Sequence, residues 1–186
     1  KVRVLLVGDS TVANYPGEQV TRGWGQVFPE FFNKQVSFRN AAKGGRSSKS
    51  FYDSGEWAEA LKFRPDIIFI QFGHNDQPGK GPQRETDPAT TYSQYLRQYL
   101  GEAKRAGAIP ILVTSVARRR FEDGKIVSTL EPWVQAMIQV GASEGVAVIE
   151  LHRSSITFFE QTGEEAGADL NNGIPGDVSH FSEKGA

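Results

Sequence analysis

The stretch that decides the fold is the N-terminal Lys1–Thr11, KVRVLLVGDST. Its apolar, β-branched run stops at Gly8, which is typical of a buried parallel strand. Functional groups of α/β proteins gather at the carboxyl ends of such strands. Ser10 follows the glycine where a helix would begin, and the free N–H groups and positive end of a helix favour an alkoxide nucleophile. The alternative is that Asp9 or Ser10 only caps a helix.

Composition narrows the class of protein. The 186 residues suffice for one domain with a core, and a net charge of −1 gives no strong field for nucleic acid or a membrane surface. No apolar run is long enough to span a bilayer. The absence of cysteine excludes disulfides, thiol nucleophiles and thiolate metal sites. Since His, Asp and Glu do not cluster at zinc-ligand spacing, we expect no metal and no other cofactor.

Strand-like and helix-like segments alternate along the chain. After the first strand, the patterns predict strands at 36–40, 66–73, 109–116 and 146–151, helices at 24–33, 56–63, 89–106, 132–143 and 154–162, and a hairpin tip at 121–127. This alternation predicts a five-stranded parallel sheet covered by helices on both faces, a three-layer α/β/α sandwich. The last residues, 181–186, are typical of the opening of a helix, so we expect a C-terminal helix that this chain lacks.

Polar and glycine-rich residues follow three of the predicted strands, at what should be one edge of the sheet. Besides Gly8-Asp9-Ser10 these are Gly44-Gly45-Arg46 and Gly73-His74-Asn75-Asp76. The glycine loop lacks the Gly-Lys-Ser/Thr ending of a phosphate loop, so nucleotide binding is excluded. A bare turn at Gly45 can present its N–H to a ligand, and the Asn75 amide can donate beside it. The alternative for Asn75 is an Asx turn.

A catalytic serine needs a histidine base held by a carboxylate, and the chain has only three histidines. His152 has no acid close behind it, and His74 adjoins Asn75 and Asp76. His180 lies in Asp177-Val178-Ser179-His180, where a turn lets the carboxylate reach the imidazole Nδ1. The alternative for this Asp-x-x-His pattern is a solvated polar loop.

Taken together, the blocks at Ser10, Gly45, Asn75 and Asp177–His180 resemble the SGNH (GDSL-type) hydrolases, in family order and over nearly the whole chain. The stretches GDSTVA, RGWG, NAAKGGRSSKSF and FGHND also look like the rhamnogalacturonan acetylesterases of carbohydrate esterase family 12. This resemblance implies a single SGNH hydrolase domain, 1–186, with a flavodoxin-like fold. Relatives continue past the histidine with a helix, so this chain departs from the family at its C-terminus.

The resemblance also assigns roles. Ser10 is the expected nucleophile, His180 its base and Asp177 the residue that orients His180. The oxyanion is expected to be held by the N–H groups of Ser10 and Gly45 and by the side chain of Asn75. The implied activity is a secreted or extracytoplasmic serine esterase that removes acetyl groups from acetylated rhamnogalacturonan in pectin degradation, through an acetyl-serine. We expect no signal peptide within these residues, and we expect a monomer.

Four residues are expected to bind the polysaccharide: Arg22, Trp24, Arg46 and His74. Basic residues near the predicted edge, which include Lys49, Arg84 and the run 118–120, suit an acidic polysaccharide, and the alternative is that they are solvated loop charges. Two other functions stay open. One is a lipid or thioester acyl hydrolase on the same scaffold, and the other is a non-catalytic carbohydrate-binding fragment.

Overall fold

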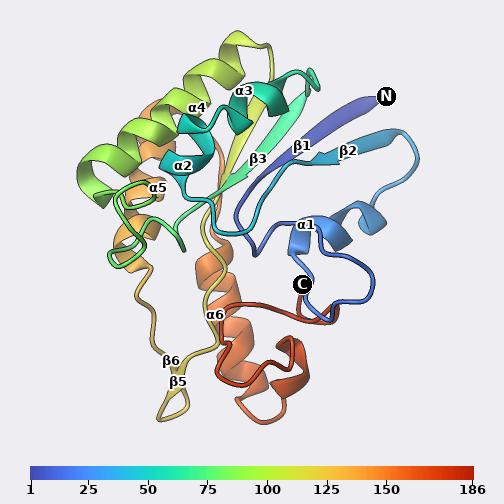
Figure 1. Cartoon of the computed structure of the whole chain (residues 1–186), viewed down its shortest axis with the longest axis vertical. Helices are drawn as coiled ribbons and strands as arrows, with labels where there is room; N and C mark the ends of the chain where they lie inside the picture. The colour runs from blue at the N-terminus through green and yellow to red at the C-terminus, as the bar shows by residue number, and fades with distance from the viewer.

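A five-stranded parallel sheet forms the centre of the molecule in the computed structural model, which describes residues 1–186 (Figure 1). Its strand order is β2-β1-β3-β4-β7. The strands are β1 (Val2–Gly8), β2 (Val36–Asn40), β3 (Ile67–Gln71), β4 (Ile109–Val113) and β7 (Val148–Ile149). Because the chain moves outward from β1 in both directions, the order reverses between β1 and β3, and ligands of such sheets bind at that point.

Helices cover both faces of the sheet, which confirms the predicted three-layer architecture. Alternate residues of β1 point to opposite faces: Leu5 and Val7 join the larger apolar core, whereas Val4 and Leu6 join a smaller one. The larger core is covered by α2 (Ser48–Asp53), α3 (Glu56–Leu61), α4 (Ser93–Arg105) and α5 (Glu131–Glu144). On the other side of the sheet lie α1 (Trp24–Val27) and α6 (Leu151–Thr162), as Figure 1 shows.

Glycine brings α5 close to the sheet. A Cβ added at Gly141 would stand 2.2 Å from Cγ2 of Val148, so the helix backbone contacts β7 through a position that only glycine fits. At the hairpin β5 (Phe121–Glu122) and β6 (Lys125–Ile126), Asp123 and Gly124 have φ of 50° and 75°, the geometry expected for an Asp-Gly turn.

Several element boundaries differ from the prediction. The helix expected at 24–33 is α1 followed by a 3₁₀ turn, Phe28–Phe31, because Pro29 has no N–H to continue the α-helical ladder. The helix expected from residue 89 begins with a π-helical turn, Pro88–Tyr92, before α4. The fifth strand is short, and α6 begins at Leu151 instead of Ser154. The last residues form turns, with a 3₁₀ turn at Ala168–Leu170 before them. None of the helices is both long and apolar enough to cross a membrane.

Candidate active site

Ser10 lies just beyond the carboxyl end of β1, beside the point where the strand order reverses. Gly8 permits this close turn, because a Cβ there would stand 2.7 Å from the carbonyl oxygen of Gln71 on β3. After the strand, the N–H groups of Val12 and Ala13 both donate to the carbonyl of Asp9, so the chain winds into a helical turn. Ser10 is half-buried at the start of that turn.

The side chains of Ser10, His180 and Asp177 form one hydrogen-bonded chain. Nε2 of His180 lies 2.9 Å from Oγ of Ser10, and its Nδ1 lies 2.8 Å from Oδ2 of Asp177. In this arrangement the neutral imidazole carries its proton on Nδ1 and turns its basic Nε2 toward the serine, which is the geometry of a serine nucleophile with its general base.

Asp177 is fixed by its own loop. Its Oδ1 accepts hydrogen bonds from the N–H groups of Ser179 and His180, and its Oδ2 accepts one from Nδ2 of Asn172 at 2.9 Å. Burial alone would raise the pKa of Asp177, but the donors of Ser179, His180 and Asn172 outweigh it and hold the pKa below its usual value. The carboxylate therefore stays ionised to orient His180. Sequence reasoning missed Asn172, because a lone Asn in a polar loop carries no signal.

Phe181 anchors the loop that carries His180. Its ring is buried and stacks on Phe159 of α6, with ring centroids 5.7 Å apart. Its carbonyl accepts from the N–H of Arg22 at 2.9 Å, so the end of the chain pairs with the segment that follows Ser10. These contacts bring residues 170 positions apart in the sequence into hydrogen-bond distance.

Three N–H groups close to Ser10 have no acceptor within the protein. The N–H groups of Ser10 and Gly45 donate no hydrogen bond within the protein. Gly44 brings that loop close, since a Cβ on it would lie 3.8 Å from Cβ of Ser10. Nδ2 of Asn75 donates one N–H to the carbonyl of Arg46 at 3.0 Å, which leaves its second N–H free. This set can stabilise an oxyanion formed at a carbonyl attacked by Ser10.

Beneath Ser10, His74 and Asp9 form a buried polar contact. Nδ1 of His74 is 3.3 Å from Oδ2 of Asp9, and both side chains are nearly inaccessible to solvent. Burial opposes ionisation of Asp9, but His74 and the two donors of Thr11 keep its pKa below the usual value. His74 therefore lies behind the turn of Ser10, not in front of it, in keeping with a structural role.

Asp76 joins the third motif to the helix after the glycine loop. Its carboxyl accepts from Oγ and N of Ser48, the first residue of α2, and from Oγ1 of Thr86. Ser47 starts that helix with a capping box to Ser50. Because complete burial disfavours the charged form, the pKa of Asp76 rises to about 7. Below that pH the carboxyl is mostly neutral, so it connects the segments of Gly45 and Asn75 without placing a second negative charge near Asp9.

The other residues expected to bind substrate have partners inside the protein. Arg22 uses its guanidinium to hold the preceding loop through the carbonyls of Gln19, Thr21 and Gly17. Nε1 of Trp24 donates to Gln71, and its ring packs edge-on against Phe28. Arg46 pairs with Glu56 at 2.7 Å. His152 is buried in α6 and contacts Ser128 and the carbonyl of Ser115, away from the triad.

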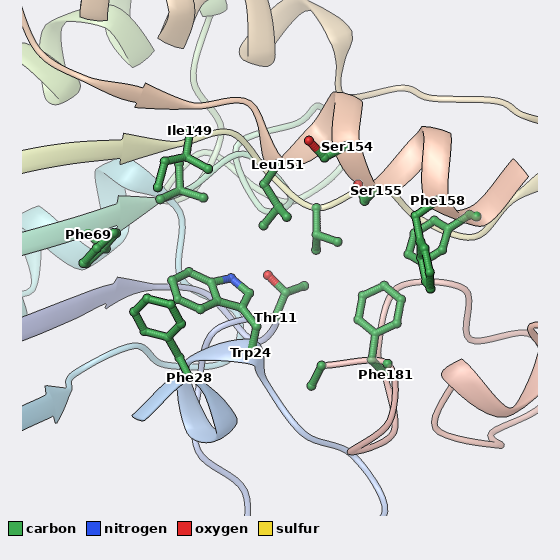
Figure 2. A pocket seen from close by; sticks show the side chains of 15 residues that line it. Thr11, Trp24, Phe28, Phe69, Ile149, Leu151, Ser154, Ser155, Phe158 and Phe181 are labelled. Carbon is green, nitrogen blue, oxygen red and sulfur yellow. The ribbon is translucent and has the colours of Figure 1, made fainter. Parts of the chain in front are cut away.

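An apolar groove of about 410 Å³ separates α1 from α6 on the sheet (Figure 2). Trp24, Phe28 and Phe69 form one side in the picture, and Leu151, Phe158 and Phe181 the other. Thr11 and Phe181 are the sequence neighbours of Ser10 and His180, yet the side chains of Ser10, His180 and Asn75 do not line the groove. The groove thus lies behind the catalytic turn.

Comparison with known proteins gives matches over nearly the whole chain. The model of the GDSL-like Lipase/Acylhydrolase family matches residues 6–186. Two Bacillus subtilis (strain 168) proteins are similar: the probable rhamnogalacturonan acetylesterase YesY is 40% identical over 98% of this chain and 86% of its own length, and the rhamnogalacturonan acetylesterase RhgT is 39% identical over 100% and 84%. The crystal structure of Bacillus subtilis YxiM superposes with a TM-score of 0.87 and 26% identity over 99% of this chain, which spans about half (52%) of that protein.

Proposed function

This chain belongs to the GDSL-like lipase/acylhydrolase family, and from that premise we propose that it is a serine esterase that removes O-acetyl groups from a carbohydrate. That it is a carboxylic ester hydrolase follows from the family and from the acetylesterases it resembles. The observation that carries the proposal is the hydrogen-bonded chain from Ser10 through His180 to Asp177, with distances of 2.9 and 2.8 Å.

The geometry supports acyl transfer in two steps. Oγ of Ser10 attacks the acetyl carbonyl while Nε2 of His180 takes its proton, and Asp177 stabilises the imidazolium. The developing oxyanion accepts hydrogen bonds from the N–H groups of Ser10 and Gly45 and from Asn75. His180 then returns the proton to the sugar oxygen, which leaves with it. Water, deprotonated by the same His180, hydrolyses the acetyl-serine and releases acetate.

The substrate we propose is acetylated rhamnogalacturonan. Its support is the identity of 39 to 40% to two proteins named for that activity. Because such a polysaccharide lies outside the cell, we propose that the enzyme is secreted or extracytoplasmic. We also propose that it works as a monomer. We also propose that residues 1–186 act as a single catalytic domain.

A lipid acyl hydrolase is the second candidate, and the apolar groove of Figure 2 is the observation that favours it. A long acyl chain needs an apolar surface that reaches the nucleophile. Because Ser10, His180 and Asn75 do not line the groove, we rank this function lower. Rates on acetate and octanoate esters separate the two, since an acetylesterase loses most of its rate on octanoate.

The test is acetate release from acetylated rhamnogalacturonan and from p-nitrophenyl acetate, with Ser10→Ala beside the wild type. We expect release by the wild type and none above background by the variant. Ser10→Ala removes only one oxygen, so the fold should be retained, as circular dichroism can verify. Release that survives in Ser10→Ala would refute the mechanism. Binding of the polymer by the wild type without release would favour a non-catalytic carbohydrate-binding role instead.

A further inference from the structure

A polar cleft of about 440 Å³ adjoins the catalytic loops. Its size lies within the range of roughly 300–1,000 Å³ that is common for small-ligand sites. Three cationic side chains line it, those of Lys80, Arg118 and Arg120, together with the hydroxyl groups of Ser128 and Thr129. No aspartate or glutamate lines the cleft, so its walls carry net positive charge.

Most of the positive charge of this cleft has no carboxylate partner within the protein. Neither Lys80 nor Arg118 lies within 4.0 Å of a carboxylate oxygen. Arg120 does pair with Glu122 at 3.0 Å, but both side chains are more than half exposed, where such a pair contributes little. Arg46, in contrast, shares Glu56 with a lysine and is compensated. The charges of Lys80 and Arg118 in the cleft therefore remain available to a bound anion.

Arg118 is held in one orientation by neutral acceptors only. They are Oγ of Ser179 at 3.0 Å, Oε1 of Gln77 at 2.8 Å, Oγ1 of Thr129 at 3.2 Å and the carbonyl of His74 at 3.4 Å. These four bonds use four of its five N–H groups and leave one on Nη2. Burial removes water from the guanidinium and lowers the pKa of Arg118. A bound anion would offset that loss of hydration.

The cleft is next to both halves of the catalytic machinery. Val178, which lies between Asp177 and His180, forms part of its wall. Gln77, which also lines it, follows the oxyanion residue Asn75 by two positions. Arg118 in the cleft also contacts Ser179 and the carbonyl of His74, so a ligand there lies next to the loops that carry His180 and Asn75.

We propose that this cleft binds the carboxylate of a uronic acid residue that neighbours the acetylated sugar. This inference rests on the proposed carbohydrate esterase function. Lys80, Arg120 and the free N–H of Arg118 supply cationic donors, which form the stronger, charge-assisted hydrogen bonds to a carboxylate. Thr129, whose Oγ1 only accepts hydrogen bonds within the protein, supplies an O–H for a sugar oxygen. The cleft thereby selects an acidic polysaccharide over a neutral one.

The experiment measures binding and so does not depend on acetyl release. Isothermal titration of the wild type with acetyl-free oligogalacturonate, and with xylo-oligosaccharide of the same length as the neutral ligand, gives two values of Kd. We expect tighter binding of the acidic ligand, with an affinity that falls as salt rises. Lys80→Gln should weaken that binding about tenfold, as the loss of one charge-assisted hydrogen bond predicts, and Arg120→Gln should weaken it further in the double variant.

The matched control is Lys34→Gln. It removes the same charge from an exposed turn at the amino end of the edge strand β2, whereas the cleft lies beyond the carboxyl ends of β3 and β4. It should leave the Kd of oligogalacturonate within twofold of the wild type. The proposal is overturned if the wild type binds both ligands equally, or if Lys80→Gln and Lys34→Gln have the same effect. Failure of the proposed function is a separate result, namely no acetate release from any acetylated polymer, whatever the two Kd values are.

Discussion

Asn75→Ala tests the oxyanion site most directly. The side chain is almost fully buried, and one of its two amide N–H groups is committed to the carbonyl of Arg46 at 3.0 Å. The second is free to stabilise the oxyanion. Loss of one such donor lowers kcat by a factor on the order of 10²–10³, equivalent to about 2.7–4 kcal/mol of transition-state stabilisation.

The bond to Arg46 makes the upper end of that range the expected result. Without it the loop that carries Gly45 loses its anchor, so a second oxyanion donor, the Gly45 N–H, is less well placed. Because these donors bind the transition state more strongly than the substrate, kcat and kcat/KM should fall together and KM should change little.

The assay is steady-state hydrolysis of p-nitrophenyl acetate by wild type, Asn75→Ala and the control Asn33→Ala. Asn33 is exposed, and its side chain only accepts from the N–H of Gln35, in the turn before β2. Thermal unfolding of each variant tests whether the fold is retained. A folded Asn75→Ala enzyme with kcat within tenfold of the wild type would refute the oxyanion assignment.

Two further predictions concern stability. Gly141→Ala should destabilise the protein by about 1–2 kcal/mol in urea unfolding, because the 2.2 Å approach to Val148 outweighs the gain in helix propensity of about 1 kcal/mol; equal or greater stability would contradict the packing. Asp76→Asn removes a carboxyl whose pKa is about 7 in the folded protein, above its value in the unfolded chain. In the wild type the unfolded chain therefore loses this proton first, and the free energy of unfolding falls as the pH rises toward 7. Relative to the variant, the wild type should lose about 2–3 kcal/mol between pH 5 and pH 8, and a difference that does not change with pH would count against it.

The strands and the motif residues could be predicted from the sequence because each depends on local pattern. The apolar runs ending at Gly8 and Gly73 mark buried parallel strands whatever packs on them. Ser10 and Asp177–His180 stand in short motifs, and the resemblance names their roles. The fold prediction is confirmed, and the expected site residues Ser10, Gly45, Asn75 and His180 lie together at one edge of the sheet.

What sequence could not supply depends on contacts between distant segments. Nothing near Asn172 indicates that its amide reaches Asp177. The run 118–120 looks uniform, yet Arg118 binds neutral acceptors, whereas Arg119 is buried between Phe121 and Phe159. The start of α6 at Leu151 has no sequence signal, because Glu150 alone separates Leu151 from the apolar run of β7 and the alternation Ile149-Glu150-Leu151 is equally typical of a continuing strand.

The separation of 170 positions between Ser10 and His180 has a consequence for synthesis of the chain. During translation about 170 residues are added between Ser10 and His180, so at 5–20 residues per second roughly 10–35 s pass before the two can meet. Until then the nascent chain carries Ser10 without the base that we propose for it. Under the proposed mechanism, esterase activity then reports that the segment around His180 has docked on the turn of Ser10.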